Sequence, residues 1–113
     1  MLNKFADEKM RDAAIRRAPQ PYGIRGLMPE ISRFFGIIIA MYYKDHAPPH
    51  FHAKYAGERA AFAISDLQII EGSLQRRAIS LVLEWAFLHR NELMENWHRA
   101  ERREDLIKIR PLD

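Results

Sequence analysis

Three of the five histidines of the chain fall within seven residues, inside the segment DHAPPHFHA that runs from Asp45 to Ala53. Imidazole titrates near neutral pH, binds metal ions and acts as a general acid or base, so this segment is the part of the chain best suited to chemistry. Pro48 and Pro49 fix two φ angles between the first two histidines, which predicts a stiff, extended loop. The cluster consists of Asp45, His46, His50 and His52.

The residues after the prolines alternate as in a β-strand, where successive side chains point to opposite faces. His50, His52 and Lys54 are expected on one face of this strand, with Phe51 on the other. We therefore predict a stiff loop that delivers imidazoles to the edge of a sheet. The predicted binding residues are Tyr43, Asp45, His46, Pro48, Pro49 and Phe51.

A metal site is one interpretation of the cluster. Its H-x(3)-H-x-H pattern, with a carboxylate beside it, offers three ligands to zinc or a similar ion. No second ligand cluster stands out elsewhere in the sequence. Glu58, His89 and His98 are the further candidate ligands.

Acid and base chemistry on RNA is a second interpretation. Cleavage through the 2′-hydroxyl needs a base, an acid and a cation beside the phosphate. His50 and His52 are candidates for base and acid, and Lys54, Arg33 or Arg59 for the cation. Charge gives this metal-independent ribonuclease little support. Residues 1–27 hold six basic and three acidic side chains, which accounts for the whole net charge of +3.

A rigid recognition loop is the third interpretation. A histidine after two prolines can bond to the loop backbone, while Phe51 anchors the loop in the core. Ordered loops serve recognition at least as often as catalysis. The residues alone leave the three interpretations open.

Length and composition limit the class of protein. A chain of 113 residues, 48% of them hydrophobic, can build one core, and the absence of cysteine excludes disulfides and thiolate chemistry. No apolar run approaches the roughly 20 residues that a membrane helix needs. We expect one cytoplasmic domain over residues 28–113. Residues 1–27 are expected to be an extension outside the core, because the stretch APQPYGIRG interrupts regular structure.

The strands that must hold the loop are predicted from hydrophobic periodicity. Residues 31–43 are apolar on both alternating faces, which is typical of one central strand. Residues 50–55 and 59–65 are expected to form a hairpin. A short strand over residues 68–71 and an edge strand over residues 107–112 are expected to follow.

A long helix is predicted over residues 74–103, with Ser73 as its N-cap. Its apolar stripe places Trp85 and Trp97 in the core, and its mixed charges predict a solvated opposite face. The sequence thus predicts an α+β fold, with an antiparallel sheet of three to four strands packed by one long C-terminal helix. The other stripe residues are Leu74, Ala78, Leu81, Val82, Leu88 and Leu93.

From Met28 onward, the chain resembles a family of small bacterial proteins, domain-of-unknown-function family 4160. Members typically begin at the equivalent of Met28, which agrees with an appended extension. The resemblance covers about 86 residues, essentially the whole domain. It is carried by MPEISRFFGIIIAMYY, DHAPPHFHA, IIEGSL, RRAISLVLEWAFLHRNELMENW and KIRPL.

The resemblance implies a partner rather than a reaction. Members of the family are associated with toxin–antitoxin-like gene pairs, so a small cognate protein is the expected partner. RNA and a second copy of the chain are the alternatives. The exposed edge of the predicted hairpin is the expected docking place, since strand edges offer unpaired backbone groups.

Overall fold

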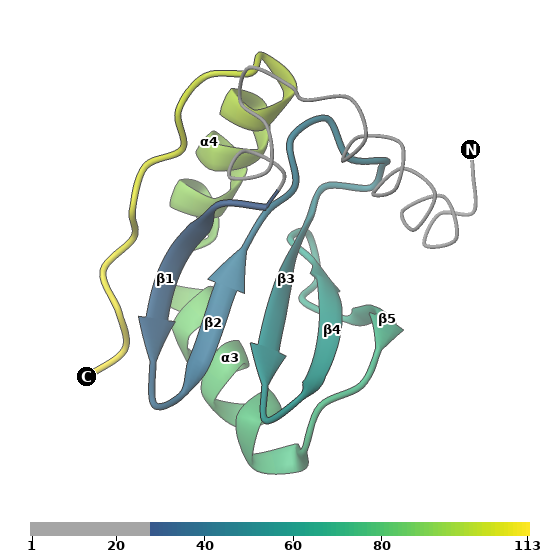
Figure 1. The fold of residues 1–113 in the computed structure, drawn as a ribbon, viewed down its shortest axis with the longest axis vertical. Coiled ribbons are helices and arrows are strands. Elements are labelled where there is room, and N and C mark those ends of the chain that lie inside the picture. Colours follow the sequence, from purple (N-terminus) through teal and green to yellow (C-terminus); the bar gives the residue numbers. More distant parts are fainter. Residues whose placement is uncertain (1–27) are drawn as a thin grey trace.

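Five short strands form one antiparallel sheet in the computed structural model, which describes residues 28–113 (Figure 1). Each strand lies beside its neighbours in sequence, in the order β1-β2-β3-β4-β5. The predicted extension over residues 1–27 lies outside the described residues. The strands are β1 (Glu30–Phe34), β2 (Ile37–Ala40), β3 (His50–Tyr55), β4 (Glu58–Ala63) and β5 (Ile69–Gly72).

The segment from Ile31 to Tyr43 contains most of β1 and all of β2, so the prediction of a single strand was wrong. A two-residue turn at Phe35 and Gly36 separates β1 from β2, and both residues have positive φ, at 48° and 82°. Two positive φ values are typical of the tight turn that matches the twist of a hairpin. Two short buried strands and one long buried strand show the same apolar pattern, which explains the error.

The predicted hairpin of β3 and β4 is confirmed. Ala56 and Gly57 form its turn, again with two positive φ values, and six residue pairs join the strands. The short strand predicted over residues 68–71 is also confirmed, as β5, shifted by one residue. The sheet therefore has five strands instead of three to four.

Two helices, α3 (Arg76–Leu88) and α4 (Arg90–Glu101), replace the single long helix that the sequence predicted. His89 separates them because its backbone, at φ −123° and ψ 24°, leaves the helical region. Helix α3 begins after Gln75, so Ser73 is not its N-cap. The α+β class is confirmed, and no helix of the described residues is long and apolar enough to cross a membrane.

The core lies between one face of the sheet and the helices. Trp85 and Trp97 are buried, as predicted. Phe51 stacks on Phe62 with 5.3 Å between ring centroids, and it meets Trp85 edge-on. Leu88 is an exception to the predicted stripe, because it is exposed at the end of α3.

The C-terminal segment runs along the outer side of β1 (Figure 1). The N–H of Ile109 donates to the carbonyl of Ile31 at 2.8 Å, and the hydroxyl of Ser32 donates to the carbonyl of Ile109 at 2.9 Å. The segment forms no regular strand, which corrects the predicted edge strand over residues 107–112. It still covers the β1 edge of the sheet.

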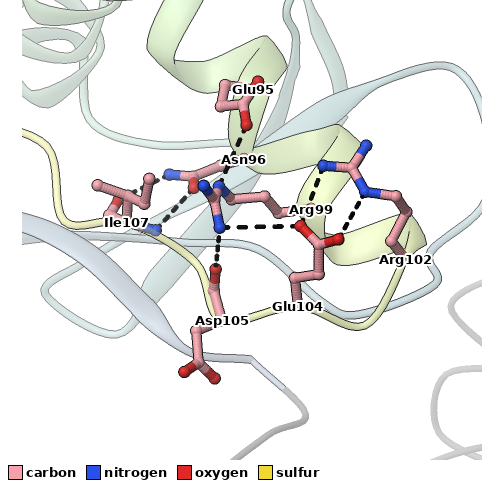
Figure 2. Close-up of polar contacts among 7 residues, drawn as sticks. All are labelled: Glu95, Asn96, Arg99, Arg102, Glu104, Asp105 and Ile107. Carbon is pink, nitrogen blue, oxygen red and sulfur yellow. Dashed lines mark hydrogen bonds and ion pairs between the residues drawn. The ribbon is translucent and has the colours of Figure 1, made fainter.

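Asn96 holds this segment against α4, as Figure 2 shows. Its side-chain amide donates to the carbonyl of Ile107, and its side-chain oxygen accepts the N–H of the same residue, both at 2.8 Å. Asn96 is buried, whereas the surrounding ion pairs of Arg99 and Arg102 lie at the surface. Surface ion pairs contribute little to the free energy of unfolding. The buried amide is therefore the main polar anchor of the segment.

Replacing Asn96 by alanine is expected to lower the free energy of unfolding by about 2 kcal/mol, because two hydrogen bonds are lost at about 1 kcal/mol each. Urea denaturation of the purified variant measures this loss. Asn91, an exposed asparagine of the same helix, provides the control. Asn91→Ala should change stability by less than about 0.5 kcal/mol. Equal effects of the two substitutions would contradict the proposed anchor.

Candidate functional site

The histidine cluster lies where the loop between β2 and β3 enters β3. This strand is the third of five and pairs with β2 on one side and β4 on the other. The prediction that the imidazoles lie at a sheet edge was therefore wrong, because the extra hairpin strand β2 covers the side that the sequence left open. The predicted hairpin likewise has no free edge.

Asp45 is the centre of the cluster. Its Oδ2 lies 2.9 Å from Nε2 of His50 and 3.3 Å from Nε2 of His52. Its Oδ1 accepts the backbone N–H of His46 at 2.7 Å. The carboxylate side chain is only 3% exposed. Two histidines of the strand and one of the loop are thus organised around a single buried carboxylate.

The three imidazole rings lie together, as predicted. Ring centroids are 4.8 Å apart for His46 and His50, and 5.0 Å apart for His50 and His52. His50 and His52 are buried, and each also meets an aromatic ring that the sequence did not assign to the site. Trp97 of α4 lies 5.3 Å from His50, and Tyr42 lies 4.9 Å from His52.

Main-chain carbonyls fix the orientation of two rings. Nδ1 of His50 donates to the carbonyl of Pro48 at 2.7 Å, and Nδ1 of His46 donates to the carbonyl of Ala47 at 2.9 Å. A carbonyl oxygen only accepts, so Nδ1 carries the hydrogen in both rings. The Nε2 atoms of both rings consequently turn toward Asp45.

Asp45 and His50 form a buried acid–base pair, with 2.9 Å between Oδ2 and Nε2. Burial on its own would lower the pKa of His50, but the hydrogen bond and the negative charge of Asp45 outweigh burial and raise it. Burial would raise the pKa of Asp45, but hydrogen bonds from His50 and His52 and the charge of His50 lower it well below its usual range. Both shifts therefore act in the same direction, toward a charged carboxylate and a protonated His50 ring.

The predicted cations lie in one row across the sheet. Arg33 pairs with Ile38, Ile38 with Lys54, and Lys54 with Arg59. Residues directly opposite one another share a face, and Lys54 shares its face with His52, two residues before it on β3. Burial and the charge of Arg59 lower the pKa of Lys54, while Arg33 is held by Glu30 at 2.8 Å.

Of the other predicted site residues, Phe51 lies in the core, and Tyr43, Pro48 and Pro49 lie in the loop. Phe51 is fully buried on the helix side of the sheet, so it anchors the loop from the core. Pro48 is exposed and Pro49 half-buried, and the carbonyl of Pro49 accepts the N–H of Ile64. Tyr43 is half-buried in the loop.

The further candidate ligands have other contacts. His89 contacts Glu92, and His98 lies 3.4 Å from Glu101, within their own helical region. Glu58 is exposed at the far end of the β3–β4 hairpin. In residues 28–113, the group whose ligand atoms lie close enough for one ion consists of Asp45, His46 and His50.

A family model described as "Domain of unknown function (DUF4160)" matches residues 36–98, more than half of the chain. The chain belongs to the DUF4160 family. The resemblance stated from the sequence is thus confirmed. The DUF4160 match contains the whole histidine cluster, both tryptophans and Asn96, so the site lies within the part of the chain that defines the family. No curated protein and no solved structure matches the chain.

Proposed function

We propose that this DUF4160 domain is the interaction component of a toxin–antitoxin-like pair of proteins. In this proposal it binds a small cognate protein, and an extended segment of that partner pairs with the outer side of β5 (Ile69–Gly72). Addition of a strand to a free sheet edge is a common mode of protein recognition. The observation that carries the proposal is the difference between the two edges of the sheet.

The two edges are protected differently. At β1, the chain's own C-terminal segment covers the edge through Ile109. At β5, no strand within residues 28–113 pairs with the outer side. Ile69 and Ile70 are 36% and 37% exposed there. Proteins usually protect such an edge with charge, proline or a covering segment, so an uncovered apolar edge favours a partner strand.

The burial of the histidines makes the ribonuclease alternative weaker. A general base must reach the 2′-hydroxyl of its substrate at about 2.6–3.2 Å. His50 and His52 are buried against Asp45, and both ring nitrogens of His50 already have partners. Lys54 and Arg59 do lie on the same face as His52, yet the proposed acid and base are less accessible than these cations.

Co-expression with the protein encoded by the adjacent reading frame tests the proposal. We expect the two proteins to co-purify, and we expect Ile70→Lys to weaken the complex at least about tenfold, because an edge lysine disfavours strand addition. Expression of one member alone should slow growth, and co-expression should relieve the effect. Affinity of the purified pair is measured by titration calorimetry.

Ile107→Lys is the matched control, because Ile107 is an exposed isoleucine on the segment at the opposite edge. This variant should bind the partner as the unmodified chain does. Absence of a complex would contradict the interaction proposal. A complex that is indifferent to Ile70→Lys would contradict the assignment of β5.

A further inference from the structure

The loop between β2 and β3 gathers three metal-ligating atoms. One carboxylate oxygen of Asp45 and one ring nitrogen each of His46 and His50 all lie within 4.8 Å of one another. Two imidazoles and one carboxylate are a common ligand set for first-row divalent metals. We propose that Asp45, His46 and His50 bind such an ion, with Zn²⁺ as the representative.

The orientation of the two imidazoles suits coordination through Nε2. In metal sites, a ligating histidine usually donates its other ring N–H to a carbonyl or carboxylate, which fixes the ring. His46 and His50 both do this, through the carbonyls of Ala47 and Pro48. Each ring therefore presents Nε2 to Asp45.

His46 supplies the strongest single argument. Its Nε2 is a buried atom with no hydrogen-bond partner. The nearest carboxylate oxygen, Oδ1 of Asp45, lies 3.6 Å away, beyond hydrogen-bond distance. A proton on Nε2 of His50 gives His50 and Asp45 a shared hydrogen bond but leaves Nε2 of His46 without a partner. A metal ion bound by all three residues satisfies it as well.

The remaining contacts fit a site with an open position. Nε2 of His52 lies 3.3 Å from Oδ2 of Asp45, and this contact orients the carboxylate. A tetrahedral zinc ion with bonds of about 2.0–2.1 Å needs ligand atoms roughly 3.3 Å apart, so the atoms that lie up to 4.8 Å apart must approach one another by up to about 1.5 Å. The side chain of His46 is 31% exposed, so the site lies near the surface, and three protein ligands leave one tetrahedral position for water.

Zinc titration of the full chain tests this site. The protein is purified without an affinity tag and stripped with chelator before calorimetry with Zn²⁺. We expect one ion per chain, and we expect His46→Ala to weaken binding at least about tenfold, as loss of a ligand or of its support does in metal sites. His98→Ala removes an exposed histidine outside the cluster and should bind zinc as the unmodified chain does.

Two results would overturn the assignment. The first is a stripped chain that takes up no zinc, and the second is a folded His46→Ala variant that binds zinc as tightly as the original. Co²⁺ absorption gives a second measurement, because the visible bands of a bound ion should be lost in His46→Ala. The site is independent of the proposed partner, so Ile70→Lys should retain full zinc binding even where it abolishes the complex.

Discussion

Replacing Asp45 by alanine is expected to destabilise the metal-free protein by about 3–5 kcal/mol, the usual cost of removing one partner of a buried ion pair. The carboxylate accepts bonds from His50, His52 and the backbone N–H of His46. Alanine leaves the buried ring of His50 without a counter-charge. Urea denaturation with chelator present measures the loss, so that no bound ion contributes.

Asp45→Asn separates the charge from the hydrogen bonds. Its amide can still accept the N–H of His46 and can donate to Nε2 of a neutral His50, so we expect a loss of about 1–2 kcal/mol, smaller than that of alanine. Asp45→Ala within about 1 kcal/mol of the original chain would show that the carboxylate does not organise the cluster. Far-ultraviolet circular dichroism of each variant establishes that the fold is retained.

The sequence predicted correctly those elements whose signal lies in the residues of the element itself. The hairpin of β3 and β4 follows from alternation on both sides of Gly57, and Trp85 and Trp97 follow from helical spacing. These predictions hold because each needs only the residues within one or two elements. The α+β class follows from the same local signals.

The two boundaries that the sequence analysis missed, between β1 and β2 and between α3 and α4, have weak sequence signals. Phe35 adopts a positive φ before Gly36, a conformation that a bulky residue seldom takes, so the pair did not read as a hairpin turn. The helix break at His89 contains no glycine or proline. The residues on both sides of each boundary pack into the common core, and a local pattern does not contain such contacts.

The site was predicted in its composition but not in its surroundings. Sequence spacing brought His46, His50 and His52 together, and the structure confirms their proximity. The contact of Trp97 with His50 depends on packing of α4 against β3, and the central role of Asp45 depends on how the loop folds back onto β3. The buried position of the site depends on β2, which exists only because the first apolar segment folds back on itself.

Gly72 ends β5, the strand to which the partner is proposed to bind. Its φ is +73°, and a Cβ placed on it would lie 2.2 Å from the carbonyl oxygen of Arg59. Gly57 has a similar φ of +83° but no atom within 4 Å of such a Cβ. The two glycines therefore share the backbone conformation and differ in the space around it.

Gly72→Ala is expected to destabilise the domain by about 3 kcal/mol, whereas Gly57→Ala should cost only about 1 kcal/mol. Both variants carry the strain of alanine at positive φ, which is about 1 kcal/mol. Only Gly72→Ala adds a collision with backbone, and such overpacking costs about 1–3 kcal/mol more. Thermal and urea unfolding of the pair measure the difference. Equal losses would mean that β5 moves away from β4 at little cost, and the edge proposed to receive the partner would then be far less rigid than its pairing with Ala60 and Ala61 implies.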